Sequence, residues 1–380
     1  MDYRLRAITT GPKHHFFGYY DMRCWDPAGR RHLVLQVDFA DRAPTADDVA
    51  TIGVVDLDGD AFTPVAATRA WNFQQGAMLN WLAGADATIV FNDRRDGRFV
   101  CVAHDLSSSV ERVLGPAAGA ISDDGRWAAT LNFARIAVTR PGYGYAGLAD
   151  PGEGRNIPDD DGVGLLDLAG GTHRLIVSFA DLAERQKPDL GYGQTKAWFN
   201  HVYFNPSATR LALLCRFVRP GQPTWTTQMW TVNPDGSDLV RCLDGPLISH
   251  FDWKDDEAIV AWTGVGGVEA MHEVDHAART RPRPVFTDAI GRDGHICYSP
   301  DRRWVVCDTY PDARGDRELF RVECATGRRV SLGAYYSPMP ADLHEIRCDF
   351  HPSWRPDGRA IAFDGMHEGS RQRYVLEFQP

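Results

Sequence analysis

The chain has 380 residues, of which 43% are hydrophobic and 24% are charged, a balance typical of soluble globular proteins rather than disordered chains. No segment approaches the roughly 18 apolar residues that a membrane helix needs. The N-terminal segment MDYRLRAITTGPKHH also lacks the apolar core of a secretion signal. The net charge of −10 argues against a general nucleic-acid binder, because phosphate neutralisation needs a basic face. We therefore expect a cytoplasmic protein that binds neither nucleic acid nor membrane.

Taken in chain order, the predicted elements are short strands separated by tight turns. Seven segments share an aromatic or apolar start, a turn and an apolar strand: WDPAGRRHLVLQVDF (from 25), NWLAGADATIVFND (from 80), ISDDGRWAATLNF (from 121), FNPSATRLALLCRF (from 204), WKDDEAIVAWTG (from 253), YSPDRRWVVCDTY (from 298) and WRPDGRAIAFDG (from 354). Another predicted strand follows each of them, for example TIGVVDLDG or QMWTVNPDG. Helical periodicity is nearly absent, and 178–186 is the one candidate helix.

A strand–turn–strand–strand unit that recurs seven times predicts an all-β fold, a seven-bladed β-propeller. The last copy ends after its third strand, so we expect the N-terminal segment YRLRAIT to supply the missing outer strand and close the ring. The prediction is a single domain, 1–380, with blade cores near 20–60, 76–108, 117–178, 200–243, 249–285, 294–332 and 347–380.

Four histidines occupy one position of this repeat. His201, His250, His295 and His351 each lie four residues before the first turn residue of their unit, in four successive units. The first strand of a propeller blade lines the central channel, so these side chains are expected to converge there. A lone histidine is more often a structural residue, whereas four at one channel position favour a functional site.

The region around His351 also predicts a metal site. Asp349 and His351 are two residues apart on a strand, so both side chains point to the same face. Together with His295 from the neighbouring blade they offer nitrogen and oxygen ligands, which suit a divalent ion such as Mn²⁺ better than Mg²⁺. We expect Mn²⁺, with Zn²⁺ or Ca²⁺ as alternatives. A metal-free network of His–Asp hydrogen bonds remains an open interpretation.

Polar and aromatic residues near the strand ends and on two long insertions predict a sugar-binding funnel, because aromatic faces pack on sugar rings and arginines bind carboxylates. The predicted substrate-binding residues are His15, Tyr20, Gln75, Arg94, Arg135, Tyr192, Trp198, Tyr310 and Arg371. Tyr143, on the Gly-rich insertion RPGYGY, and Arg216 are predicted to take part in catalysis.

Several strings resemble the oligogalacturonate lyase and ulvan lyase group of propeller polysaccharide lyases: HHFFGYYD, WNFQQG, FNDR, RPGYGY, NHVYFNPS, GHICYSPD with CDTYPD, and CDFHPSW with HEGSRQRYV. The resemblance spans nearly the whole chain. It implies that His250 occupies the position of the catalytic histidine and that His295 and His351 are metal ligands. The chain departs from the oligogalacturonate lyase pattern at Asp349, where a histidine is expected, and it lacks a clear glutamine ligand. The ulvan lyase side of the group relies on a histidine and a tyrosine, which implies His201 with Tyr143 or Tyr192.

The resulting functional prediction is β-elimination on a small acidic oligosaccharide that contains a uronate. Removal of the C5 proton requires that the neighbouring carboxylate be neutralised, here by the metal and Arg216. His250 is the predicted base, and His201 or a tyrosine is the predicted acid. We expect a monomer or a homodimer. Two alternatives stay open: a glycoside hydrolase using two of Asp21, Asp93, Glu345 and Asp349, and a propeller that only binds a sugar or a protein.

Overall fold

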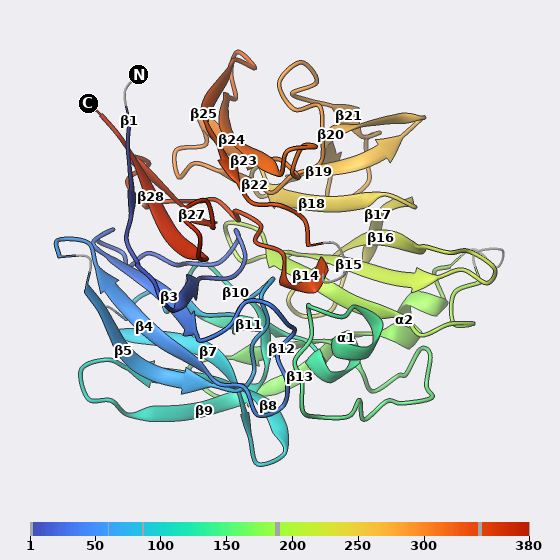
Figure 1. Ribbon diagram of the computed structural model, residues 1–380. Coiled ribbons are helices and arrows are strands. Elements are labelled where there is room, and N and C mark those ends of the chain that lie inside the picture. Colours follow the sequence, from blue (N-terminus) through green and yellow to red (C-terminus); the bar gives the residue numbers. More distant parts are fainter. Residues whose placement is uncertain (1–2, 60, 86, 187–190, 341–343, 380) are drawn as a thin grey trace.

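The computed structural model describes residues 3–59, 61–85, 87–186, 191–340 and 344–379 (Figure 1). Within these residues the strands form seven sheets of four antiparallel strands each. The sheets follow one another around a ring in chain order (Figure 1). The predicted all-β fold, a seven-bladed β-propeller, is therefore confirmed.

The first four sheets are built from consecutive strands. They comprise β2 (His14–Phe16), β3 (Arg31–Val37), β4 (Ala50–Asp56) and β5 (Ala61–Thr68); β6 (Asn80–Trp81), β7 (Thr88–Arg95), β8 (Arg98–Asp105) and β9 (Glu111–Pro116); β10 (Ala118–Ile121), β11 (Trp127–Thr130), β12 (Gly162–Asp167) and β13 (His173–Ser178); and β14 (Trp198–Phe204), β15 (Leu211–Val218), β16 (Trp225–Val232) and β17 (Val240–Gly245).

The last three sheets include one that joins the two ends of the chain. They comprise β18 (Ile248–Trp253), β19 (Ala258–Val265), β20 (Val268–Asp275) and β21 (Arg283–Pro284); β22 (Ile296–Tyr298), β23 (Trp304–Asp308), β24 (Asp316–Glu323) and β25 (Arg329–Tyr336); and β26 (Ser353–Trp354), β27 (Ala360–Gly365), β28 (Gln372–Phe378) and β1 (Tyr3–Ala7). In the last sheet β1 pairs antiparallel with β28, next to which it lies in Figure 1.

The turns that follow the inner strands are closed by side chains at one repeated position. Asp26 accepts hydrogen bonds from the backbone N–H groups four and five residues later, and so does Asn205. The hydroxyls of Ser122 and Ser299 accept from the N–H five residues later. Short polar side chains stabilise turns in this way, which explains why Asp, Asn and Ser recur where the sequence repeats.

Helices are few and short. α2 (Phe179–Ala183) lies within the predicted helix 178–186, with Ser178 as its N-cap. α1 (Phe133–Thr139) was not predicted from the sequence; the side chain of Asn132 caps its first turn. A 3-10 helix spans His344–Ile346. No helix in the described ranges is long and apolar enough to cross a membrane.

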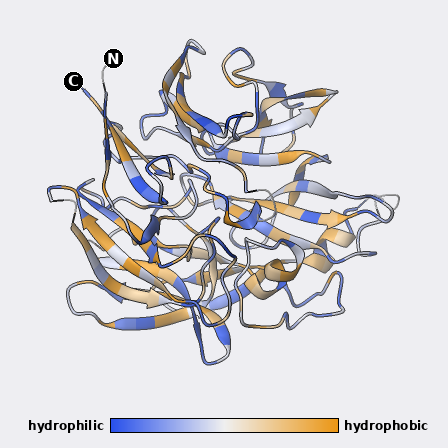
Figure 2. Cartoon of the chain, in the orientation of Figure 1, coloured by the Kyte–Doolittle hydropathy of each residue, from blue (hydrophilic) through white to orange (hydrophobic). Residues whose placement is uncertain are grey.

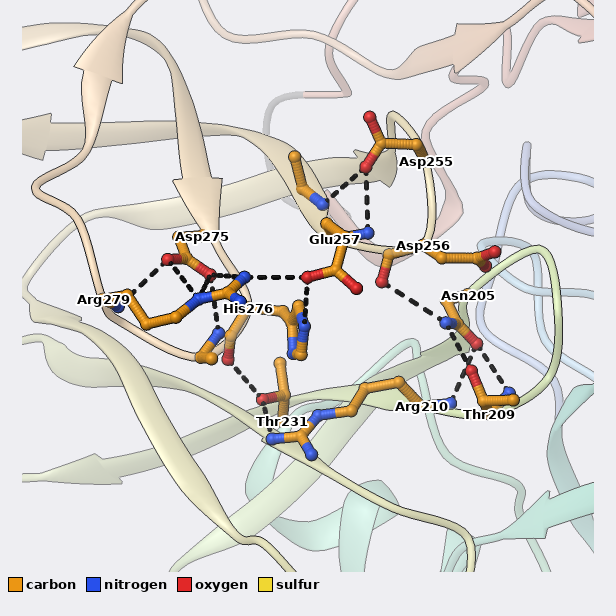
Figure 3. A network of polar contacts seen from close by, with 12 residues as sticks. Asn205, Thr209, Arg210, Thr231, Asp255, Asp256, Glu257, Asp275, His276 and Arg279 are labelled. Atoms are coloured by element: carbon orange, nitrogen blue, oxygen red, sulfur yellow. Dashed lines mark hydrogen bonds and ion pairs between the residues drawn. The ribbon is translucent and has the colours of Figure 1, made fainter.

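Neighbouring sheets are joined by apolar packing and by polar contacts at their rims. Hydrophobic residues concentrate in the strands, whereas the loops are mostly hydrophilic (Figure 2). Figure 3 shows one polar link, between the fourth and fifth sheets. Glu257 contacts Arg279 (2.8 Å) and His276 (3.3 Å), and the carbonyl of His276 accepts a hydrogen bond from Thr231 on β16 at 2.7 Å. Arg210 donates in turn to the Thr231 hydroxyl at 2.9 Å.

Candidate active site

The inner strands and the residues just before them bring the four repeat histidines together beside Tyr19 and Tyr20. The centroid of the Tyr19 ring lies 5.1 Å from that of His201, 5.8 Å from His295 and 4.9 Å from His351. The rings of His250 and His295 are 4.1 Å apart, and those of His295 and His351 are 4.3 Å apart. A chain of imidazoles therefore runs across the channel, as expected for one structural position repeated in adjacent blades.

A cavity of about 320 Å³ opens on this histidine cluster. The residues that line it are Tyr19, Arg140, Tyr143, Asn200, His201, Leu214, Arg216, Thr224, Trp225, Pro246, Leu247, Ile248, Ser249, His250 and Tyr310. Five of the residues predicted from the sequence lie in this wall. Among the described residues that line the cavity none is an aspartate or a glutamate. We call this space the histidine cavity.

Two histidines of the cavity wall are each held by an aspartate behind it. Nε2 of His201 lies 2.8 Å from Oδ2 of Asp21, and Nδ1 of His250 lies 2.9 Å from Oδ1 of Asp293. Within the described chain, Nε2 of His250 has no hydrogen-bond partner, so it can accept a proton from a molecule in the cavity. Burial lowers the pKa of His250, which the Asp293 carboxylate partly offsets, so the imidazole is neutral at pH 7.

Arg216 and Arg140 make the cavity electropositive. The guanidinium of Arg140 lies 4.7 Å from the centroid of the Trp225 ring, and that of Arg216 lies 5.6 Å from it. Burial and the neighbouring Arg140 lower the pKa of Arg216 to about 10, which leaves it charged at pH 7. In the described residues neither guanidinium has a carboxylate within ion-pair distance. These two positive charges are available to an anionic group in the cavity.

Tyr143 is placed in the cavity by the loop after α1. Its hydroxyl accepts a hydrogen bond from Nη2 of Arg347 at 3.0 Å, and Arg140 lies over its ring at 4.7 Å. Burial opposes ionisation of this phenol, but Arg347 and Arg140 outweigh it and lower the pKa of Tyr143 below its usual value. An arginine-stabilised phenol of this kind transfers its proton more readily than an ordinary tyrosine.

His295, Asp349 and His351 form a buried group next to the cavity. Their candidate ligand atoms all lie within 4.8 Å of one another. Asp308 holds Nδ1 of His295 at 2.9 Å, which leaves Nε2 as the free lone pair. Nε2 of His295 and both ring nitrogens of His351 are buried without a hydrogen-bond partner among the described residues. His351 also has a φ of 43°, a sparsely populated backbone region for a residue other than glycine.

These residues fit a divalent ion. Unpartnered buried imidazole nitrogens are rare, and a metal would satisfy them. Asp349 forms ion pairs with Arg317 at 2.8 Å and Arg347 at 2.7 Å. Burial alone would raise the pKa of Asp349, but the two arginines hold it well below its usual range. The carboxylate is therefore ionised, and its oxygens have lone pairs beyond those facing the arginines.

Four predicted substrate-binding residues lie outside the cavity wall, in hydrogen-bond networks of their own. The ring nitrogens of His15 face Gln372 at 2.9 Å and Gln36 at 2.8 Å. Arg94 donates to the carbonyl of Ala46, and Arg371 pairs with Asp364 at 3.0 Å. Gln75 belongs to the turn that Asn72 closes. Its neighbour Gln74 is the residue that faces the Tyr143 hydroxyl, at 3.5 Å.

The other four lie behind or beside the cavity. Arg135 is buried on α1 and donates to three backbone carbonyls, Tyr192 donates to the carbonyl of Phe179, and Trp198 packs behind Trp225. Tyr20 contacts the histidine rings but directs its hydroxyl to the Phe251 carbonyl at 2.9 Å. None of these eight residues is among the described residues that line the histidine cavity, and their role in substrate binding stays a prediction.

Solved structures similar to this chain include oligogalacturonate lyases. A structure of oligogalacturonate lyase in complex with manganese has 16% sequence identity and a TM-score of 0.69, with 99% of this chain and 93% of that chain covered. An oligogalacturonate lyase from Vibrio parahaemolyticus has 13% identity and a TM-score of 0.67 over 98% and 93% of the two chains. This chain has their fold.

The fold is shared more widely at lower similarity. The β-propeller domain of the Trilobed protease from Pyrococcus furiosus has 9% identity and a TM-score of 0.50, with 98% and 95% of the chains covered. No family model matches the sequence, and no curated protein does. The resemblance to oligogalacturonate lyases that the motifs indicated is thus confirmed at the level of the fold, and the chemistry has to be argued from the site.

Proposed function

We propose that this protein is a carbon–oxygen lyase that cleaves a short uronate-containing oligosaccharide by β-elimination. The observation that carries the proposal is the composition of the histidine cavity. Its wall contains two aspartate-held histidines, an arginine-activated tyrosine and two arginines that have no carboxylate partner in the described part of the chain. Removal of a proton beside a carboxylate needs a base to take the proton, cations to neutralise the carboxylate, and an acid to protonate the leaving oxygen.

Each residue has one part in the elimination. Arg216 and Arg140 bind the uronate carboxylate, so that negative charge developing on it is stabilised. Nε2 of His250 takes the C5 proton, the C4–O4 bond breaks, and a C4–C5 double bond forms. Tyr143, or His201, protonates the leaving O4 oxygen. His295, Asp349 and His351 would hold the divalent ion, which when bound supplies further positive charge for carboxylate neutralisation.

The glycoside hydrolase alternative gains no support from this cavity. A hydrolase of that kind needs two carboxyl groups across the sugar. Asp21 is bound to His201, Asp349 lies between two arginines, and Asp93 pairs with Arg95. None of these, nor Glu345, is among the described residues of the wall.

The test is to incubate the protein with galacturonate di- and trisaccharides and with ulvan oligosaccharides, with and without Mn²⁺. We expect the ultraviolet absorbance of an unsaturated uronate to appear, and His250→Ala to reduce its rate at least a hundredfold. His173→Ala, which changes a histidine outside the cavity, is the matched control. Saturated products would instead establish a hydrolase, and no turnover of any uronate would contradict the proposal.

The metal is tested separately by a readout that does not depend on activity. Because a bound ion stabilises the folded state by mass action, Mn²⁺ should raise the melting temperature of the metal-free protein. His295→Ala should abolish this rise. An equal rise in wild type and variant would place the ion elsewhere.

A further inference from the structure

A second cavity, of about 470 Å³, lies at the other end of the propeller channel. The inner strands run from one cavity to the other. On β14, His201 lines the histidine cavity and Tyr203 lines the second one; on β18, His250 lines the first and Asp252 the second. The segment 19–23 separates the two spaces, since Tyr19 lines only the histidine cavity, whereas residues 20–23 line only the second. We call the second space the distal cavity.

Aromatic side chains form much of the wall of the distal cavity, four from inner strands of four sheets and one, Trp25, from the connection between β2 and β3. They are Trp25, Trp81, Tyr203, Tyr298 and Trp354. The repeat places an aromatic residue near the end of the inner strand, so the ring of blades surrounds the channel with aromatic rings. Such a surface suits a ligand with an apolar face, and a volume of several hundred cubic ångströms suits one small molecule.

The wall also contains hydrogen-bond acceptors that lack full partners. Asp252 is 4% exposed and accepts the backbone N–H of Tyr298 at 2.8 Å, yet it forms no ion pair with any described residue. Asp21 uses Oδ2 to hold His201, and its Oδ1 is buried with no hydrogen-bond partner in the described chain. Its side chain is 6% exposed. Buried carboxyl groups are normally paired, so these two need an explanation.

Two hydrogen-bond donors in the same wall also lack partners. Nε1 of Trp25 and Nη1 of Arg23 are buried without hydrogen-bond partners among the described residues, although Nη2 of Arg23 pairs with Asp123 at 3.0 Å. The remaining arginine, Arg302, donates to the carbonyl of Trp253 and lies 5.5 Å from the centroid of the Tyr298 ring. Residues of this wall therefore carry both acceptors and donors without partners, and the unpartnered atoms of Asp21, Trp25 and Arg23 are themselves buried.

We propose that the distal cavity is a binding site for a neutral sugar residue. A hydroxyl group both donates and accepts, so a polyol can pair with Asp252 and, when their side chains turn toward it, with Asp21, Trp25 and Arg23, which a purely cationic or anionic ligand cannot. The aromatic wall packs against the C–H face of a pyranose ring. Above pH 7 the carboxylates of Asp21 and Asp252 repel a uronate, in contrast to the arginines of the histidine cavity. The proposal does not depend on the lyase reaction.

The test measures binding of D-galactose, L-rhamnose and D-xylose by titration calorimetry and by tryptophan fluorescence. D-galacturonate and cadaverine serve as an anionic and a cationic probe. We expect saturable binding of at least one neutral sugar, at least tenfold tighter than either charged probe. Trp354→Phe should raise its Kd at least tenfold, whereas Trp225→Phe, the matched change in the histidine cavity, should leave it unchanged.

Asp252→Asn provides a second variant that keeps the shape of the wall. It too should raise the Kd of the neutral sugar, and the melting temperature of each variant checks that it is folded. No saturable binding of any of the three neutral sugars would overturn the proposal. Tighter binding of galacturonate or cadaverine, or a Kd that neither Trp354→Phe nor Asp252→Asn changes, would overturn it equally.

Discussion

At the scale of single residues, the histidine–aspartate pairs decide which nitrogen is available for chemistry. Asp293 holds Nδ1 of His250 at 2.9 Å, and Asp308 holds Nδ1 of His295 at 2.9 Å. Each carboxylate selects the tautomer whose other nitrogen has a free lone pair. Asp293 stands in the segment GRDGH, two residues before His295. This acidic residue two positions before a repeat histidine is a signal in the sequence from which the partner of His250 could have been predicted.

Asp293→Asn is expected to lower kcat on a uronate oligosaccharide at least tenfold while leaving KM nearly unchanged. Asp293 contacts His250 but is not part of the cavity wall, so it acts on proton transfer rather than on substrate binding. Steady-state kinetics measure both constants. Asp288→Asn on the same connection serves as the control, and an unchanged kcat in Asp293→Asn would contradict the role.

Asp252 predicts a pH dependence of stability. Burial raises its pKa to about 7, whereas an aspartate in an unfolded chain has a pKa of about 4. Between these values the folded state binds more protons than the unfolded state, so the Asp252 contribution falls as pH rises from about 4 to 7. Asp252→Asn cannot ionise, and it should gain stability relative to wild type over this range, by up to about 4 kcal/mol. Melting temperatures at pH 4.5 and 8 measure this, and an equal difference at both pH values would contradict it.

At the scale of elements, the loop before β22 sets the position of His295. Gly294 packs so closely against β23 that an added Cβ would overlap the carbonyl oxygen of Asp308, whereas a Cβ at Gly291 meets nothing within 4 Å. The close approach lets the backbone N–H of His295 donate to the Asp308 carboxylate at 2.7 Å. A glycine is required there because any side chain would push the two strands apart.

Gly294→Ala is therefore expected to destabilise the fold by about 1–3 kcal/mol and to weaken the rise of melting temperature with Mn²⁺. Gly291→Ala, on the same loop, should change neither. Thermal denaturation with and without Mn²⁺ distinguishes the two variants. Equal behaviour of both would show that the Gly294 contact does not position His295.

At the scale of the whole molecule, one sheet contains both ends of the chain. Five residue pairs from Tyr3↔Phe378 to Ala7↔Tyr374 join β1 to β28. Leu5 and Ala7 also pack against the apolar cluster of this sheet. Hydrogen bonds between the two ends, such as that from the His15 N–H to the Arg371 carbonyl at 2.7 Å, add to this pairing. We infer that the β1–β28 pairing helps to keep the propeller closed.

Removal of residues 1–7 should lower the melting temperature by at least about 5 °C, since it leaves the edge of β28 unpaired and exposes apolar surface. Differential scanning calorimetry of the shortened and full chains measures the effect. A peptide with the sequence YRLRAIT, added in excess, should recover part of the loss. An unchanged melting temperature would show that β1 contributes little to closure.

The sequence by itself determined the architecture and the histidine register. Turns closed by Asp, Asn or Ser are local signals in the sequence, and so are alternating apolar residues. Their sevenfold repetition permits only a ring of similar sheets. Because one repeat position means one place in the blade, His201, His250, His295 and His351 were expected to meet, and they do.

Only the tertiary structure decided which polar partners these residues have. Asp21 reaches His201 across 180 positions of the chain, and Arg347 reaches Tyr143 across 204. Arg135 and His15 have the same chemistry as site residues, but their hydrogen bonds are used inside the fold. A side chain's partners depend on contacts between distant segments, and a local pattern contains no information about those contacts. For that reason the sequence predicted the meeting of the four histidines better than it predicted which residues line the cavity beside them.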